Sequence, residues 1–163
     1  MPAVIDTTNQ LVLSMSIGKD YLKTAIRRLK YYRDLGEKAL DQLSEEQIHH
    51  SPNPTVNSVA ITIQHLAGNM ISRWTHFLTE DGEKDWRERD EEFEPHSRSK
   101  ADLMAIWHQG WDLFLQTLES LEKKDLKKMV SIRKEPLTVI DAINRQLAHY
   151  PYHIGQIITR SEE

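Results

Sequence analysis

The sequence contains no cysteine. This absence excludes disulfides, thiolate zinc fingers and a cysteine nucleophile. Also missing is any apolar run near the ~20 residues that a membrane-spanning helix needs. The first ten residues, MPAVIDTTNQ, lack the basic stretch followed by an apolar stretch that marks a signal peptide. We therefore expect a cytoplasmic protein without a membrane partner.

The basic residues form no stripe or cluster along the chain. The 21 Lys and Arg residues are interspersed with 25 Asp and Glu residues, and the net charge is -4. We therefore expect no nucleic-acid partner. Hydrophobic residues make up 39% of the sequence and are spread along it, which permits a packed core. The length of 163 residues fits one domain spanning residues 1–163.

Four stretches repeat apolar residues with helical spacing, at about residues 8–35, 57–78, 99–121 and 138–159. Gly36 is placed to stop the first helix, and Asn57 or Ser58 to cap the second. Ser99 with Asp102 forms a capping-box pattern before the third. These features predict an all-α four-helix bundle, whose interior can hold a metal or a ligand. A long connection separates the second and third helices, and the segment KKMVSIRKEP predicts a short strand or irregular stretch before the last helix.

Two histidines in the last stretch, His149 and His153, are four residues apart and point from one helical face. This spacing is common for imidazole metal ligands, although solvent-exposed or hydrogen-bonded histidines fit it as well. A turn of ~100° per residue places both histidines away from the apolar stripe of the helix. That side also carries Arg145, Gln146, Gln156 and Arg160. The face therefore meets either solvent or a polar groove beside the core.

Pro151 lies between these two histidines. A proline inside a helix removes one hydrogen bond and clashes with the carbonyl four residues back, here Leu147, at a cost of ~3 kcal/mol. A kink that aims the two histidines at one cation would offset this cost. The alternative is that Pro151 bends the helix around the core.

A third metal ligand has to come from another part of the chain. The remaining histidines are His49, His50, His65, His76, His96 and His108. His65 lies in the second helical stretch, nearly opposite its apolar stripe, among small and polar neighbours such as Gly68 and Asn69. Such a face suits a ligand-accessible cavity and suits solvent equally well.

The segments QHLAGNM around His65 and HYPYHIGQI around His149 and His153 resemble the DinB/YfiT-like superfamily of bacterial metalloenzymes. The segments DGEKDWRERDEEF and INRQLAHYPYHIGQI are similar to one branch of it that has no assigned reaction. The resemblance extends over nearly the whole chain. It implies a four-helix bundle, a homodimer, and a divalent metal, nickel or zinc, bound by His65, His149 and His153.

The resemblance also implies an activity, because members of the superfamily include bacillithiol transferases and a mycothiol-dependent maleylpyruvate isomerase. Three protein ligands leave coordination positions open, as in catalytic sites, and the cation acidifies a bound water or thiol. The absence of cysteine fits a nucleophilic sulfur that comes from a low-molecular-weight thiol. We expect a metal-dependent thiol transferase acting on a small-molecule substrate. Hydrolysis by activated water and a non-catalytic, dimeric stress-response module are the alternatives.

Other metal-site templates fit the sequence less well. The H-E-x-x-H pattern is absent, because Tyr150 follows His149. A di-iron site requires Glu-x-x-His on two helices, and only Glu46 with His49 matches. No Asp or Glu lies within four residues of His149 or His153, so the sequence identifies no general base.

Further polar residues lie near the three histidines in the helical stretches. The substrate-binding candidates are Asn69, Arg73, Gln146, Gln156 and Arg160. They are expected to bind polar or carboxylate groups of a substrate, unless they belong to an ordinary solvated face. The connection over residues 80–99 exceeds the ~2–8 residues usual in bundles. Trp86 and Phe93 can dock it onto the helices, so we expect it to cover the metal groove, with a dimer contact or a solvated acidic loop as other interpretations.

Overall fold

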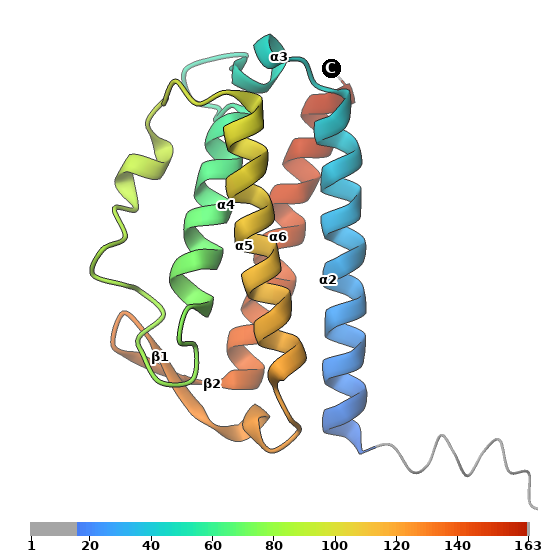
Figure 1. The fold of residues 1–163 in the computed structure, drawn as a ribbon, viewed down its shortest axis with the longest axis vertical. Coiled ribbons are helices and arrows are strands. Elements are labelled where there is room, and N and C mark those ends of the chain that lie inside the picture. The colour runs from blue at the N-terminus through green and yellow to red at the C-terminus, as the bar shows by residue number, and fades with distance from the viewer. Residues whose placement is uncertain (1–15, 163) are drawn as a thin grey trace, which may run out of the picture.

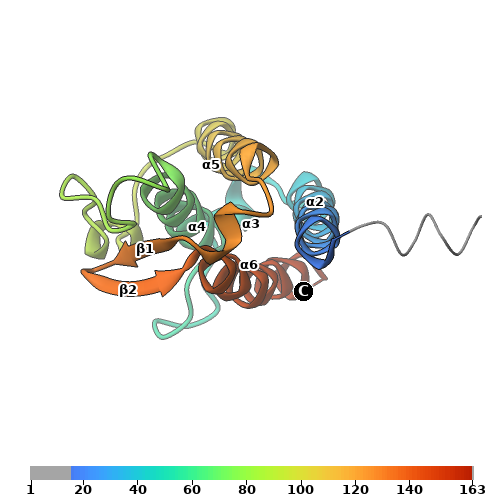
Figure 2. The same cartoon turned by 90° about the horizontal axis from the view of Figure 1, so that it is seen from below.

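Four long helices form a bundle in the computed structural model, which describes residues 16–162. They are α2 (Ile17–Gln42), α4 (Val59–Trp74), α5 (Lys100–Ser120) and α6 (Val139–Glu162). Figures 1 and 2 show them side by side around a common axis. The predicted all-α four-helix bundle is confirmed. Among the described residues, no helix is long and apolar enough to cross a membrane.

The predicted helix starts are confirmed for two of these helices. The Ser58 hydroxyl accepts a hydrogen bond from the Ile61 amide at the start of α4. The capping box of Ser99 and Asp102 begins α5. A short helix, α3 (Glu45–His49), closes the end of the bundle between α2 and α4.

The prediction that Gly36 ends the first helix is wrong. α2 continues to Gln42, and the predicted start at residue 8 lies outside the described residues. Gly36 is buried where α2 meets α5 and α6. A Cβ atom there would lie 2.8 Å from Ile154 Cδ1 and 2.9 Å from the Trp107 ring. The glycine therefore permits close helix packing, and the 3.6-residue pattern continues past it.

A β-hairpin precedes α6, after the short 3-10 helix η2 (Asp125–Lys127). Strand β1 (Met129–Ile132) pairs antiparallel with β2 (Glu135–Thr138), so the predicted strand is confirmed. Arg133 and Lys134 form the turn with positive φ angles of 54° and 65°. The Asp81 carboxylate accepts hydrogen bonds from both of their amides at 2.8 Å. This carboxylate fixes the turn against the connection between α4 and α5.

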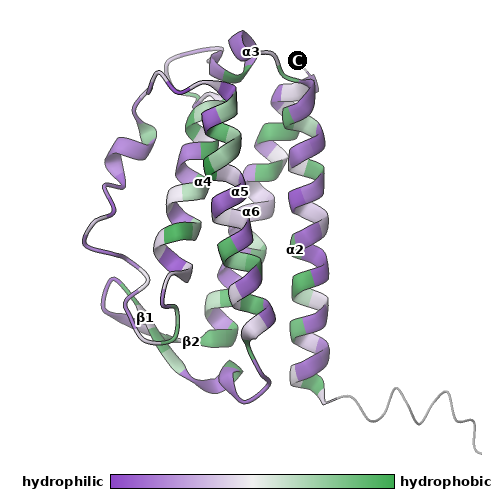
Figure 3. Ribbon diagram, viewed as in Figure 1, coloured by the Kyte–Doolittle hydropathy of each residue, from purple (hydrophilic) through white to green (hydrophobic). Residues whose placement is uncertain are grey.

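The connection between α4 and α5 lies along the outer side of α4, on the same side of the bundle as the hairpin (Figures 1 and 2). It is hydrophilic along most of its length (Figure 3) and contains the 3-10 helix η1 (Asp90–Phe93). The Gln64 amide of α4 donates to the carbonyls of Glu92 and Glu94 at 3.2 Å. Trp86 is 58% exposed, so hydrogen bonds and Phe93 hold the connection, and Trp86 contributes little.

The core is rich in aromatic side chains, and the helices do not all pack equally closely. Trp74, Trp107, Trp111, Phe114 and Tyr150 are all buried. α4 packs most extensively on α5, and α2 on α6, whereas α4 and α6 share a smaller contact. Polar side chains that point between α4 and α6 therefore do not have to displace the core.

Candidate metal centre

Three histidines meet between α4 and α6. Nε2 of His65, on α4, lies 3.4 Å from Nε2 of His149, on α6. Nε2 of His153, one turn later on α6, lies 3.1 Å from Nε2 of His149. The three possible ligand atoms all lie within 4.8 Å of one another. The structure thus brings together the three residues that the family resemblance implied as ligands.

Each imidazole is held by an oxygen at its other nitrogen. Nδ1 of His65 lies 3.1 Å from the Glu92 carboxylate. An ionised carboxylate accepts hydrogen bonds and cannot donate them. Nδ1 of His149 lies 3.3 Å from Oε1 of Gln146, and Nδ1 of His153 lies 2.7 Å from Oε1 of Gln156. These acceptors assign the ring protons to the Nδ1 atoms. The three Nε2 lone pairs then point toward one another.

Converging lone pairs repel unless a cation or a proton lies between them. A tetrahedral metal with bonds of ~2.0–2.1 Å to imidazole sets its ligand nitrogens about 3.3 Å apart. The Nε2 separations of 3.4 Å and 3.1 Å are close to this value. The outer oxygens also match the usual surroundings of metal-binding histidines, whose second nitrogen donates to a carboxylate or carbonyl group. The residues present therefore fit a divalent cation.

The surroundings of His149 and His153 favour the neutral state of these two imidazoles. Burial lowers the pKa of His149 to about 3, and the positive charges of protonated His153 and His65 and of two arginines act in the same direction. Burial also lowers the pKa of His153, although the hydrogen bond with Gln156 raises it. A neutral imidazole is the form that binds a metal.

The Glu92 carboxylate links His65 to a buried arginine. Nε and Nη2 of Arg87 donate to the two carboxylate oxygens of Glu92 at 2.7 Å and 2.8 Å. Burial raises the pKa of Glu92, but the hydrogen bonds from His65 and Arg87 outweigh this effect and lower it. The ring of Phe93 packs on the His65 ring with centroids 4.8 Å apart. The predicted covering connection therefore closes the outer side of His65.

The close approach of this connection requires a glycine on α4. A Cβ atom at Gly68 would overlap the Glu92 carboxylate, including its Cδ atom at 2.6 Å. Any larger side chain would push the carboxylate away from His65, one turn earlier on α4. Gly68 is therefore part of the site, although it carries no functional group.

Tyr150 anchors the helix turn that carries His149. Its ring is completely buried, and its hydroxyl accepts from Trp74 Nε1 at 3.1 Å and donates to Asn69 Oδ1 at 3.0 Å. Successive residues on a helix point ~100° apart. The buried Tyr150 side chain therefore fixes the direction in which His149 points.

A cavity of about 360 Å³ lies beside the histidines, lined by His65 and His149. Three of the substrate-binding candidates, Asn69, Arg73 and Gln146, also line it. The pKa of the Arg73 guanidinium is lowered, mainly by burial and further by the positive charges of Arg87 and Arg145. The Glu83 carboxylate acts in the opposite direction. Three of the five substrate-binding candidates thus lie at one cavity.

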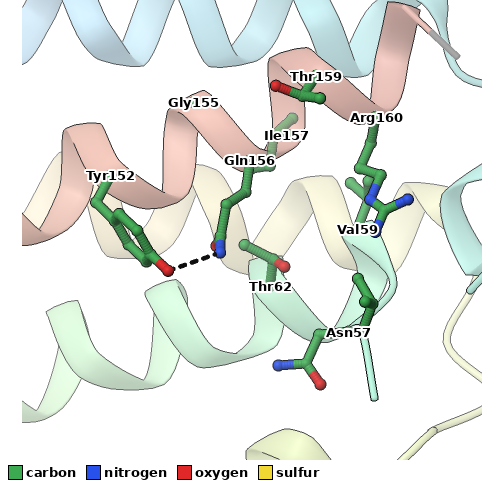
Figure 4. A pocket seen from close by; sticks show the side chains of 10 residues that line it. Asn57, Val59, Thr62, Tyr152, Gly155, Gln156, Ile157, Thr159 and Arg160 are labelled. Atoms are coloured by element: carbon green, nitrogen blue, oxygen red, sulfur yellow. Dashed lines mark hydrogen bonds between the residues drawn. The ribbon is translucent and has the colours of Figure 1, made fainter. Parts of the chain in front are cut away.

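The other two candidates line a different pocket, shown in Figure 4. Gln156 and Arg160 lie with Tyr152 along α6 and face Thr62 near the start of α4. Nε2 of Gln156 donates to the Tyr152 hydroxyl at 3.1 Å, while its Oε1 is the acceptor for His153. Gln156 therefore connects the centre to this second pocket, whereas Arg160 lies one turn further away.

Sequence reasoning missed several residues around the centre. Glu92 lies 27 positions from His65 in sequence, and no spacing rule joins them. Arg145 also lines the cavity. The sequence places it on the helix face of His149, but it is not among the substrate-binding candidates, although its spacing of four residues from His149 favours it. Among the described residues, the five other histidines do not join the cluster; they are His49, His50, His76, His96 and His108. The His96 ring is bonded to the Glu91 carbonyl.

Comparisons with known proteins agree with this fold. The family described as "Protein of unknown function (DUF1572)" matches residues 16–162. The crystal structure of a conserved protein from Enterococcus faecalis is similar, with a TM-score of 0.67 at 18% sequence identity, covering 91% of this chain and 96% of that chain. This similarity concerns the fold alone. No curated protein matches the chain.

Proposed function

The chain belongs to the DUF1572 family, whose match spans residues 16–162, and we propose that it is a divalent-metal-dependent enzyme. The observation that supports this most strongly is the arrangement of His65, His149 and His153. Their Nε2 atoms converge, and each Nδ1 atom has an oxygen partner. Nickel and zinc are the cations that we propose, because imidazole suits both.

A cation held by three imidazoles keeps coordination positions open and lowers the pKa of a thiol or water that enters one of them. The chain's own residues supply the rest of the site. Glu92 orients the His65 ring, and Phe93 covers it. His65 and His149 both line the adjacent cavity, so a molecule bound there lies next to the converging nitrogens.

We propose that the reaction is transfer of a low-molecular-weight thiol to an electrophile. The sulfur forms a bond to carbon, the leaving group departs with its electron pair, and the thiol proton passes to solvent. Two features favour this reaction: the sequence has no cysteine to provide the sulfur, and it resembles the DinB/YfiT-like superfamily of bacterial metalloenzymes. That resemblance also leads us to propose a homodimer.

Metal binding is tested by titrating chelator-treated protein with Zn²⁺ and with Ni²⁺ in a calorimeter. We expect one ion per chain for the wild type and strongly weakened binding for His65→Ala, His149→Ala and His153→Ala. His50→Ala, which removes an exposed histidine outside the cluster, serves as the matched control. Undiminished binding in all three variants would show that the assignment of the site is wrong.

Catalysis is tested separately on protein loaded with one ion. A panel of small thiols is offered with halogenated or epoxide electrophiles, and products are identified by mass. We expect a thioether that is absent with His149→Ala. If metal binds but neither thioethers nor hydrolysis products of esters and amides form, the non-catalytic module is the better description.

A further inference from the structure

The cavity beside the histidines carries an excess of positive charge. Five of its nine lining residues are arginines, and none is acidic. The arginines are Arg73, Arg87, Arg89, Arg133 and Arg145. They come from α4, the connection after it, the hairpin turn and α6, so four separate segments direct cationic side chains to one place.

The nearby carboxylates do not balance these charges. Glu92 is bound by both arms of the Arg87 guanidinium. Glu83 is shared, because it lies 3.4 Å from Arg73, 3.3 Å from Arg87 and 3.3 Å from Arg133. Asp90 approaches Arg89 only at 4.0 Å and is fully exposed. The Glu83 and Glu92 carboxylates thus pair with three of the five arginines.

Two of the arginines retain unused donors. Arg73 is only 8% exposed, and its Nη1 atom is buried without a hydrogen-bond partner in the described part of the chain. A buried charged donor without an acceptor is unfavourable, and a bound anion would supply the acceptor. Arg145 is exposed and makes no ion pair with another residue of the range 16–162. Both side chains are therefore available to an incoming ligand.

Helical spacing relates these arginines to the metal centre. On α4, His65, Asn69 and Arg73 follow one another at intervals of four residues, which places them on one face. On α6 the same interval separates Arg145 from His149. His65 lies next to His149, and Arg73 and Arg145 line the same cavity. Both arginines therefore lie on the same side of the histidine pair along the bundle axis. With a rise of 1.5 Å per residue, Arg73 lies ~12 Å along the axis from His65 and Arg145 ~6 Å from His149.

We propose that this cavity binds the anionic end of the substrate, a carboxylate or phosphate group, while the reactive end of the same molecule lies at His65 and His149. The inference rests on the proposed function, because it assigns the substrate class of that enzyme. Guanidinium groups bind such oxyanions with paired hydrogen bonds. The cavity volume of about 360 Å³ suits a small metabolite. Arg73 and Arg145 hold the anion, and Asp81 positions Arg133 through the hairpin turn.

Calorimetric titration with inorganic phosphate and, separately, with succinate tests the proposal. Both anions are titrated into metal-free and into Zn²⁺-loaded protein at ionic strength fixed with chloride. We expect binding of at least one anion to both forms. The tighter anion then identifies whether phosphate or carboxylate is the preferred group. No binding of either anion to either form would overturn the proposal.

Variants locate the anion. Arg145→Gln changes an exposed side chain, so it should fold normally and keep its Zn²⁺ affinity while binding the anion at least tenfold more weakly. Arg73→Gln should show the same loss. Arg28→Gln, which removes an exposed charge from α2, is the matched control and should bind as the wild type does. Wild-type anion affinity in Arg145→Gln and Arg73→Gln would overturn the proposal, even if Zn²⁺ binding is normal. The histidine variants test the metal assignment independently. If they lose Zn²⁺ binding but still bind the anion, the anion site does not depend on the metal.

Discussion

The Glu92 carboxylate lies 3.1 Å from Nδ1 of His65, although 27 residues separate the two in sequence. The same carboxylate forms a salt bridge with Arg87, whose side chain is only 2% exposed. This contact joins the long connection after α4 to the candidate metal centre. It also gives the connection a role besides covering the bundle, because it orients the ring of His65, one of the three candidate ligands.

We expect Glu92→Ala to weaken Zn²⁺ binding by roughly 10–100-fold, the usual effect of losing an outer partner of a ligating histidine. Glu92→Gln keeps an acceptor for His65 but loses the charge, so its Zn²⁺ affinity should fall between those of the wild type and Glu92→Ala. Calorimetric titration with Zn²⁺ measures both. Glu91→Ala, at the exposed neighbouring position, is the control. Equal affinity in Glu92→Ala and Glu91→Ala would contradict this role of Glu92.

Gly68→Ala should weaken Zn²⁺ binding without changing any ligand. The added methyl group would overlap the Glu92 carboxylate and displace it from His65. Gly155→Ala is a matched substitution on α6, where a Cβ atom would meet nothing within 4 Å. There we expect unchanged Zn²⁺ affinity and a gain in stability of about 0.5–1 kcal/mol, because alanine is the better helix former. Similar Zn²⁺ affinities for the two variants would argue against the proposed role of Gly68.

Tyr150→Phe should lower the free energy of unfolding by about 1–3 kcal/mol, because it leaves the buried Trp74 N–H and Asn69 carbonyl without their partner. Chemical denaturation monitored by tryptophan fluorescence measures this loss. Tyr152→Phe removes a hydroxyl from a 63% exposed ring and should change stability by less than about 0.5 kcal/mol. Equal effects of the two substitutions would mean that the Tyr150 hydroxyl does not anchor α6.

The metal-free protein should lose stability in acid, in part through His149. Its pKa is lowered from 6.5 to about 3 in the folded state, mainly by burial. Between these values the unfolded chain binds a proton that the folded chain does not, so this contribution is complete above pH ~6.5 and is lost as the pH falls toward 3. Melting temperatures of chelator-treated wild type and His149→Gln between pH 7.5 and 4 measure it. The variant should show the shallower decline, and parallel curves would exclude His149 as a cause.

Much of the architecture follows from local sequence patterns. The helical spacing of apolar residues predicts the four long helices, and Ser58 and Ser99 mark where two of them begin. Gly36 shows the limit of this reasoning. A glycine near the end of a helical pattern commonly stops the helix, but here the tight packing of Ile154 and Trp107 against α2 requires a missing side chain. A local pattern does not contain that distant contact. Whether Pro151 kinks α6 to aim the histidines stays a prediction.

By itself the sequence determined the helical bundle, and it placed His149 and His153 on one face, because helix periodicity depends only on neighbours along the chain. The choice of His65 as their partner came from a family resemblance, since spacing left its face open to either solvent or a cavity. Only the tertiary structure decided which oxygens hold the imidazoles and which arginines gather beside them. Glu92 meets His65, and Arg133 shares a cavity with Arg145. These contacts depend on how a long connection and a hairpin fold back onto α4 and α6, and that arrangement has no period that a sequence pattern could reveal.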